Sequence, residues 1–343
     1  MSALLDRLGP LGRWLTPAML VAFLLSGTLP LWIEPVGLYD YLGVEILIWC
    51  IYALGFNLLL GYAGLPSFGH GAFFGIGAYA MGLAQLRLAT GLWLGLALAT
   101  LAAAVFGAAV ALCISHRRGI YYALMTIAFG QMFFFVASKW TSVTRGEDGL
   151  LDIKRPPVDL GVVSLDLGGN AAMGYFVFGC FVAVTVLLWR LVHSPFGTIL
   201  KAIKQNESRM AFLGYNVFVY KWAVFTLSCA VAGFAGGLFA MAQGGAFIQV
   251  MSLQWSGVVV LMVLIGGGLV SFWGPVVGTV LYFVARDVLG SLTETWLLWY
   301  GLMFVLVVMF KPEGLAGMWQ TAARRLGARR AATAARLQPL AEP

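Results

Sequence analysis

The sequence predicts an all-α integral membrane protein, a polytopic bundle of about ten transmembrane helices, with about eight to ten as the range. Of the 343 residues, 61% are hydrophobic and only 10% are charged, whereas about a quarter of an ordinary soluble domain is charged. Long apolar runs recur along nearly the whole chain. Residues 97–112 are apolar on every side, whereas the strands of a membrane barrel alternate with a period of two. Helices are therefore expected, and strands are not.

The apolar runs also predict the domain organisation. A helix needs about 20 apolar residues to cross a bilayer. The candidate spans, in chain order, are residues 17–33, 38–60, 66–86, 91–114, 120–138, 171–191, 222–243, 253–271, 275–291 and 295–310. They form one transmembrane domain, 17–310, between an N-terminal segment, 1–16, and a basic tail, 311–343. Polar stretches at 139–170 and 193–221 are the expected loops on opposite sides of the membrane.

The distribution of Lys and Arg predicts the orientation. When the N-terminus is placed in the cytoplasm, most of the 21 basic residues fall in cytoplasmic segments, as the positive-inside rule requires. Both termini, including the tail 311–343, are then cytoplasmic. The net charge of +7 matches an anionic membrane leaflet and needs no nucleic acid to explain it. Arg7 and Arg13 precede an apolar run without a convincing cleavage site, which indicates an uncleaved first helix.

Residues that could support catalysis or hold a cofactor are sparse. The sequence contains no GxxxxGK[ST] phosphate-binding loop. The three histidines are too scattered to form a metal or haem site, and the four cysteines lie within spans without CxxC spacing, as small buried apolar residues. These residues are His70, His116, His193, Cys50, Cys113, Cys180 and Cys229. We therefore expect a transport protein that is not an enzyme and carries no cofactor or metal.

Glu45 is the one acidic residue well inside a predicted span. Intramembrane carboxylates often mark proton or sodium pathways, so Glu45 leaves open an ion-coupled secondary transporter. The alternative is a satisfied carboxylate that faces the bundle or a lipid headgroup. The sequence provides no second carboxylate deep in a span to extend such a pathway.

Small residues recur at helical spacing in two segments. The first set is Gly71, Gly75, Ala78 and Gly82, and the second is Gly233, Gly237, Ala240 and Gly244. Small residues on one face allow transmembrane helices to approach closely. Both sets predict tight helix packing.

The stretch GYAGLPSFGHGAFFGIGAYA, residues 61–80, cannot be one continuous helix. Proline removes a backbone donor and glycine frees the chain, so a helix break is expected over 61–71. Residues 268–272 (GLVSF) repeat 64–68 (GLPSF) at four of five positions and predict a second break within 266–275. Paired, interrupted segments in two halves of a transporter point to its binding site. The candidate translocation-path residues are Gly61, Gly64, Pro66, Ser67, Gly69, His70, Gly71, Gly268 and Ser271. Alternatively, Ser67 and His70 bond to backbone groups that the break frees.

The polar segment 193–221 predicts an amphipathic cytoplasmic helix over 194–214. Ser194 can cap it, Pro195 can begin it, and Gly214 can end it. Such a helix either lies on the leaflet or docks into a groove on a partner. The residues proposed for the docking interpretation are Ser194, Phe196, Gly197, Leu200, Ala202, Ile203, Asn206, Glu207, Leu213 and Gly214.

These motifs resemble those of a known family. The stretch 61–80 is similar to the GYAGQLSLGHAAFFGIGAY signature of permease subunits of branched-chain amino acid ABC importers, and in particular of M-type (LivM) subunits. Similarity continues through residues 118–134, 194–221, 264–278 and 310–317, and parts of it also resemble urea-importer permeases. This sequence departs from the usual signature at Leu65, Pro66 and Phe68.

The resemblance implies an ABC importer permease fold and a set of partners. It implies a paralogous H-type permease subunit, two cytoplasmic ATPases, a periplasmic binding protein and a surrounding lipid membrane, the bacterial inner membrane. Residues 194–214 would be the coupling helix that docks on an ATPase, and ATP would be hydrolysed on those partner chains. Branched-chain amino acids are the expected cargo, with urea, short amides or other amino acids as alternatives.

Overall fold

The structure, a computed structural model, describes residues 41–159, 164–310, 314–315 and 317–318. The candidate span 17–33, the N-terminal segment 1–16 and nearly all of the tail 311–343 lie outside the described residues. The helices are α4 Tyr41–Asn57, α5 Gly71–Leu88, α6 Leu92–Ile114, α7 Gly119–Lys139, α8 Thr141–Thr144, α9 Asn170–His193, α10 Pro195–Gln205, α11 Glu207–Phe212, α12 Val217–Gln243, α13 Leu253–Gly266, α14 Gly274–Leu292 and α15 Trp296–Phe310. A π-helical turn η2, Leu58–Tyr62, extends α4, and a 3₁₀ turn η3, Ile248–Met251, precedes α13.

The predicted all-helical membrane architecture is confirmed. Within the described part of the chain, six helices are long and apolar enough to cross a membrane, and α13 and α15 are shorter apolar helices. Their bounds differ from the predicted spans in three places: α5 begins at Gly71, α12 begins at Val217, and α13 ends at Gly266. Strands were not expected, yet the described residues include four two-residue strands. These are β1 Leu150–Leu151, paired antiparallel with β4 Gly245–Ala246, and β2 Val158–Asp159, paired with β3 Ser164–Leu165.

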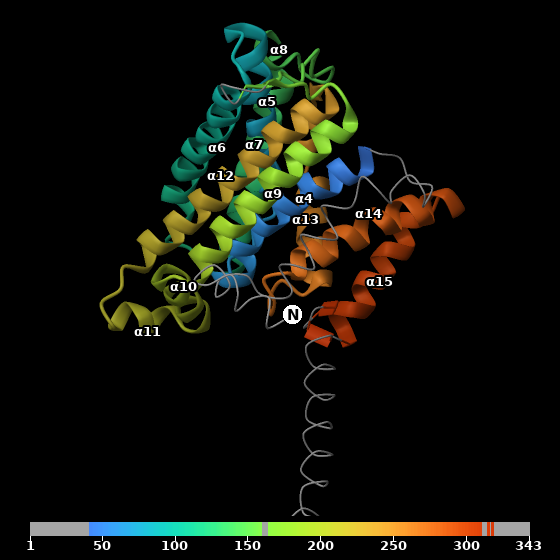
Figure 1. Ribbon diagram of the computed structural model, residues 1–343. Coiled ribbons are helices and arrows are strands. Elements are labelled where there is room, and N and C mark those ends of the chain that lie inside the picture. The colour runs from blue at the N-terminus through green and yellow to red at the C-terminus, as the bar shows by residue number, and fades with distance from the viewer. Residues whose placement is uncertain (1–40, 160–163, 311–313, 316, 319–343) are drawn as a thin grey trace, which may run out of the picture.

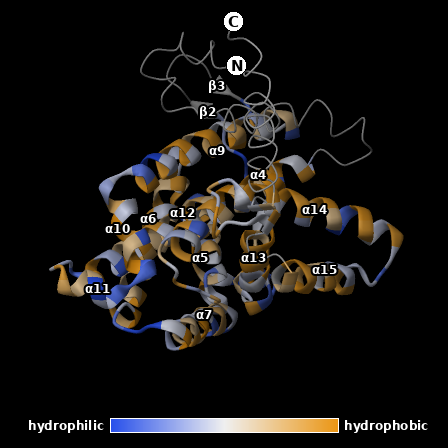
Figure 2. Cartoon of the chain, turned by 90° about the horizontal axis from the view of Figure 1, so that it is seen from below, coloured by the Kyte–Doolittle hydropathy of each residue, from blue (hydrophilic) through white to orange (hydrophobic). Residues whose placement is uncertain are grey.

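The loops gather at opposite ends of the molecule. Figure 1 shows α8 and the neighbouring loops at the upper end, and α10 with α11 at the lower end. The loop 139–170 and the segment 193–221 therefore lie on opposite sides, as the sequence predicts. Seen from below, hydrophilic residues gather on α10 and α11, whereas α13 and α15 are largely hydrophobic (Figure 2).

Helix α4 is the centre of the bundle. The 22-residue helical stretch Tyr41–Tyr62 is buried along the whole of its apolar window. Helices α9, α12, α13 and α14 pack around it, and α5, α6 and α12 form a tightly packed group at one side. A helix that is apolar all round is suited to this position because every face meets another helix.

Most of the small-residue stripes lie at close helix contacts, but Gly82 packs on the loop residue Ile153, and Gly244 ends α12 in the left-handed conformation. Gly233 and Gly237 pack against Ala99 and Ala103 of α6. Gly75 faces the side chain of Met251. The closest approach of α5 to α12 uses two glycines outside these stripes: a Cβ on Gly77 would collide with the backbone of Gly233, and one on Gly236 with the carbonyl of Phe74.

Gly236→Leu should therefore separate α5 from α12 and destabilise the bundle. Overpacking a tight contact costs about 3 kcal/mol, and here the obstacle is backbone that has no rotamer to change. The matched control is Gly179→Leu in α9, because nothing lies within 4 Å of a Cβ at that position. Thermal unfolding of both variants in detergent measures the difference. If the unfolding midpoint of Gly236→Leu equals that of the wild type, α5 and α12 can move apart without loss of stability, and the prediction is wrong.

Candidate functional site

The first predicted helix break is confirmed. After α4, the amide of Ala63 bonds to the carbonyl of Leu58 at 3.3 Å, and Leu65 bonds to Leu59 at 3.1 Å. Both bonds reach back further than the four residues of an α-helix. Residues 63–70 are then irregular, with Gly64 at φ +70°, until α5 begins at Gly71.

The second predicted break is also present. Helix α13 ends at Gly266 and α14 begins at Gly274. Gly267, at φ +88°, ends the helix in the left-handed conformation, and the amide of Gly268 bonds to the carbonyl of Val263 at 2.8 Å. Ser271 lies in the turn between the helices and is partly exposed.

The two breaks meet in space. A Cβ on Gly61 would lie 2.7 Å from the carbonyl oxygen of Gly268, so the two backbones are in direct contact. Asn57 lies between them, with its Oδ1 2.6 Å from a Cβ built on Gly268. Asn57 is 1% exposed, and within the described structure its amide nitrogen and oxygen have no hydrogen-bond partner. Asn57 was not among the residues expected from the sequence, although an amide in the apolar run 38–60 is a signal for it.

Ser67 and His70 lie in the interior of the chain, each 0% exposed. The Oγ of Ser228 donates to the carbonyl of Gly55 at 2.8 Å and lies 2.9 Å from Nε2 of His70. Because the hydroxyl has one proton, Nε2 of His70 donates to it, which places the ring proton on Nε2. Four aromatic rings surround the imidazole: Tyr52, Phe56, Phe73 and Phe225. The Oγ of Ser67 and Nδ1 of His70 have no hydrogen-bond partner within the described structure, so neither side chain bonds to backbone groups that the break frees.

The remaining residues of the first break attach it to α7 and α13. Gly69 packs so closely on α7 that a Cβ there would collide with the carbonyl of Thr126. The amide of Phe68 donates to the Oγ1 of Thr126 at 3.1 Å, and the amide of Gly71 donates to the Oγ of Ser256 at 3.0 Å. The start of α5 is thus capped by another helix, and Pro66 lies partly exposed in the connecting loop.

The segment 194–214 differs from the single helix that was expected. It forms α10 and α11, separated at Asn206, whose extended backbone (φ −158°) stops the first helix. The Oδ1 of Asn206 accepts the amide of Arg209 at 2.9 Å and so caps the second helix. The Oγ of Ser194 does not cap α10, because it donates to the carbonyl of Leu191 at 2.6 Å. Gly214, at φ +87°, lies just after α11.

The apolar residues of this pair divide between the interior and the surface. Leu200, Ile203 and Gly197 are buried within the chain, where Gly197 packs on the carbonyl of Val192. Phe196 stacks on Tyr220, and Ala202 is half-buried. Phe212 and Leu213 are 91% and 66% exposed. The surface available to a partner is therefore at the end of α11, while the α10 residues hold the pair on the bundle.

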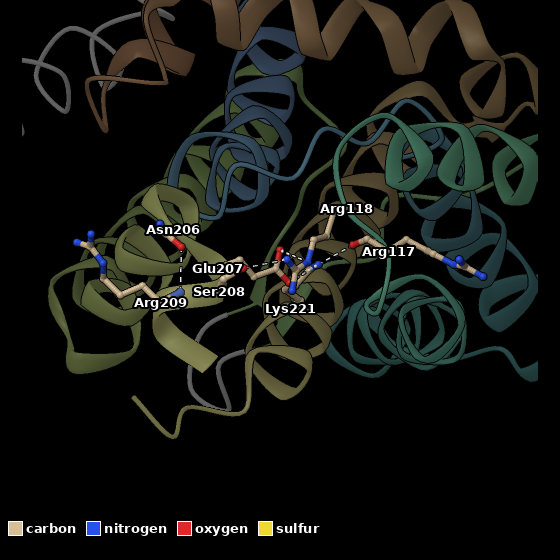
Figure 3. Close-up of polar contacts among 7 residues, drawn as sticks. All are labelled: Arg117, Arg118, Asn206, Glu207, Ser208, Arg209 and Lys221. Atoms are coloured by element: carbon tan, nitrogen blue, oxygen red, sulfur yellow. Dashed lines mark hydrogen bonds and ion pairs between the residues drawn. The ribbon is translucent and has the colours of Figure 1, made fainter. Parts of the chain in front are cut away.

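A network of charges fastens α11 to the spanning helices (Figure 3). The carboxylate of Glu207 accepts from Lys221 at 3.2 Å and from Arg118 at 3.1 Å. The side chain of Lys221 is 1% exposed, and its Nζ also donates to the carbonyl of Arg117 at 2.6 Å. Arg118 additionally donates to the Oγ of Ser208. Glu207 thus joins α11 to the start of α7 and the start of α12.

Lys204 connects α10 directly to the first helix break. Its Nζ donates to the carbonyl of Gly61 at 2.7 Å, and its Cγ would lie 2.7 Å from a Cβ on Gly64. Burial lowers the pKa of Lys204. Lys201 lies 5.2 Å above the ring of Tyr62. Lys204 therefore joins α10 to the carbonyl that stands where the two breaks meet, and no local pattern in the sequence indicates this contact.

Glu45 is a paired carboxylate. Arg286 of α14 donates to Oε1 at 3.2 Å and to Oε2 at 2.9 Å, and its guanidinium lies 4.6 Å above the ring of Phe283. Of the two interpretations of Glu45, this pairing favours the satisfied carboxylate that faces the bundle.

The cysteines are less uniformly buried than expected. Cys50 and Cys229 are buried, but Cys180 is half-buried and Cys113 is exposed on α6. None of the four forms a disulfide. Among the residues that the structure describes, no group of three His, Cys, Asp or Glu side chains is placed to hold a metal ion.

Comparisons with known proteins agree with this architecture. The LivM high-affinity branched-chain amino acid permease protein of Escherichia coli K12 is 29% identical over 292 residues, which is 79% of this chain and 68% of the relative. The probable LivM permease protein of Methanocaldococcus jannaschii is 24% identical over 325 residues, 79% and 92% of the two chains. A nucleoside ABC transporter permease, NupC of Lactococcus lactis, is 31% identical over 96 residues, 28% of this chain and 29% of the relative. No solved structure matches.

The family assignment rests on the match across the spanning region. The sequence model described as "Branched-chain amino acid transport system / permease component" matches residues 38–310, which include both helix breaks, α10 and α11. The chain is a multi-pass membrane protein, and it belongs to the family of branched-chain amino acid transport permeases.

Proposed function

We propose that this chain is one of two permease subunits of an ATP-binding-cassette importer for leucine, isoleucine and valine. The observation that carries the proposal is the Lys204 contact, which joins a surface helix pair to the meeting point of two helix breaks. The partners are a paralogous H-type permease, two cytoplasmic ATPases and a periplasmic binding protein. The complex resides in the bacterial inner membrane with both termini of this chain in the cytoplasm.

The ATPase docks at the end of α11. Phe212 and Leu213 supply an exposed apolar anchor, and the exposed Arg209 supplies charge beside it. An apolar anchor that fills a groove on a partner is the usual way a short helix binds. ATP-driven closure of the partner then pushes α11 and α10, and Lys204 passes the movement to Gly61. This arrangement explains how a chain without a phosphate-binding loop can be powered by ATP.

Reconstitution in liposomes tests this function. The chain, co-expressed with the two ATPases and the second permease, should take up leucine when the binding protein is outside and ATP inside. Phe212→Asp should abolish both co-purification of the ATPase and uptake, whereas Leu187→Ala, an exposed position on α9, should retain both. ATP-dependent uptake of urea or a nucleoside, with none of leucine, would assign a different cargo to the same machinery. Uptake that needs no ATPase would refute the proposal.

A secondary transporter that acts alone is the competing function, and Glu45 distinguishes the two. In an ATP-driven importer, Glu45→Gln should leave uptake per molecule nearly unchanged, because the amide oxygen can still accept from Arg286. Collapse of the proton and sodium gradients with ionophores should also have no effect. If the variant loses uptake while the protein remains folded, or if ionophores stop uptake by the wild type, ion coupling is favoured.

A further inference from the structure

Three exposed glutamines lie on adjoining elements at one side of the bundle. They are Gln131 in α7, Gln249 in η3 and Gln254 at the start of α13. The three elements contact one another: α7 with η3, and α13 with both. We call this surface the amide face.

The depth of the amide face follows from its contacts with α5. Gly82 of α5 faces Ile153 in the loop at the α8 end, Gly75 faces Met251, and Gly71 bonds to Ser256. Eleven residues of helix separate Gly82 from Gly71, a distance of about 16 Å at about 1.5 Å per residue. The hydrocarbon core of a bilayer is about 30 Å thick. Gly75, which faces Met251, is seven residues or about 10 Å from Gly82, so the segment from Met251 to Ser256 lies about 10–16 Å below the loop at the α8 end, toward the middle of the membrane.

Gln131 lies at the same depth. It follows Gly130, whose Cβ would be 2.7 Å from the Cα of Gly69, two residues before the start of α5. Gln131 is thus level with the lower end of α5, close to the start of α13, rather than near either membrane surface.

This surface is ill-suited to lipid. Residues 244–252 form a two-residue strand and a single 3₁₀ turn instead of a continuous α-helix. Irregular backbone at membrane depth is tolerated only inside protein or beside a water-filled cavity. Ile248, Val250 and Met251 are buried, but Gln249 between them is exposed. An amide side chain facing hydrocarbon is costly, so water or a polar solute is the medium that fits it.

The amide face continues toward the α10–α11 end as a hollow. The hollow has a volume of about 410 Å³ and is lined by Arg117, Tyr121, Leu124, Met125 and Ala128. Residues at spacings of three and four share one side of a helix, so Tyr121, Leu124, Ala128 and Gln131 form a continuous stripe on α7. Along α7, the polar groups of Arg117 and Tyr121 lie at the α10–α11 end. The apolar side chains of Leu124 and Ala128 follow, and the amide of Gln131 comes last.

We propose that the amide face is this chain's wall of the translocation path, completed by the second permease subunit. Gln131 and Gln249 contact the ammonium and carboxylate groups of the passing amino acid, because a carboxamide both donates and accepts hydrogen bonds. Leu124, Met125 and Ala128 contact its aliphatic side chain on the way to the cytoplasm. This inference rests on the proposed function and adds to it the route within this chain.

The accessibility of introduced cysteines in the assembled importer tests whether the amide face lines the translocation path. In a Cys113→Ser, Cys180→Ser background, single cysteines replace Gln131, Gln249 and, as the lipid-facing control, Leu101 of α6, which is 59% exposed. A charged methanethiosulfonate reagent needs an ionised thiol, which only a wet position provides. We expect reaction at 131 and 249 at least about tenfold faster than at 101. Addition of leucine, together with the binding protein and ATP, should slow the reaction of the cysteines at 131 and 249.

A second pair of variants tests whether the two amides contribute to leucine transport. Gln131→Leu and Gln249→Leu should lower leucine uptake about tenfold, the loss of about one hydrogen bond each, while ATP hydrolysis by the complex continues. Gln131→Asn should restore part of the uptake. If both cysteines react no faster than the one at 101 while the wild-type importer works, the wall lies elsewhere and the amides contact the partner permease. If the wild type transports no leucine with ATP, the proposed function fails, and the reaction rates still decide whether this face is wet.

Discussion

Glu207→Ala is expected to lower the stability of the isolated chain by about 2 kcal/mol and to release α11 from the bundle. The side chain of Lys221, 1% exposed, would keep its bond to the Arg117 carbonyl and its contact with the ring of Tyr122 but would lose its carboxylate partner. Loss of one partner of a fully buried pair costs about 3–5 kcal/mol, and the smaller figure applies here because Glu207 is 21% exposed. Thermal unfolding of the purified protein in detergent measures the change, with a midpoint several degrees lower.

A double variant separates the charge effect from loss of packing. Glu207→Ala with Lys221→Met removes the buried charge together with its partner, and most of the lost stability should return. Glu147→Ala, at an exposed position in the loop at the opposite end, should leave the midpoint unchanged. An unfolding midpoint for Glu207→Ala equal to that of wild type would show that the network in Figure 3 does not hold α11.

Lys204→Met is expected to uncouple ATP hydrolysis from transport. Methionine keeps an apolar stem over Gly64 but cannot donate to the carbonyl of Gly61, a bond of 2.7 Å. A hydrogen bond from a charged donor contributes about 1.5–3 kcal/mol, so leucine uptake per ATP hydrolysed should fall about tenfold or more. Co-purification with the ATPase should persist, because Phe212 and Leu213 are untouched. Reconstituted uptake and phosphate release, measured on the same liposomes, report the ratio.

The matched control is Lys201→Met, one helical turn earlier on α10. Lys201 lies over the ring of Tyr62, a contact of about 0.5–1 kcal/mol at an exposed site. Its loss should reduce the ratio of uptake to hydrolysis by only about two- to fivefold. Equal ratios for Lys204→Met and wild type would mean that movement reaches the helix breaks by another route, such as Glu207 and α12.

Several features of the fold could be predicted because their causes are local. A run of apolar residues must lie in lipid or in protein wherever the rest of the chain goes. Gly64 and Pro66 interrupt a helix through their own backbone chemistry, and the structure has the break between η2 and Gly71. The second break was predicted because residues 268–272 repeat residues 64–68 at four of five positions. The separation of α10 from α11 was missed because Asn206 permits a cap but does not require one.

The contacts at the candidate site could not be predicted in this way. Asn57 lies between two breaks that are about 200 residues apart in the chain, so its position depends on how α4 packs against α13 and α14. Leu200 and Ile203 form an apolar stripe that fits a partner's groove as well as this chain's own core, and only packing shows that it is used internally. The same holds for Glu45, whose partner Arg286 lies 241 residues away.

The sequence by itself determined the membrane class, the approximate positions of the apolar helices in the described chain, the two helix breaks and the family, because hydrophobicity, backbone freedom and motif are properties of neighbouring residues. Only the tertiary structure decided that the breaks meet at Asn57, that Lys204 bonds to Gly61 and that Glu207 neutralises a buried lysine. It also brought Gln131 and Gln249 to one face. These contacts join residues far apart in the chain, and side chains at such separations meet only when packing of the whole bundle brings their helices together.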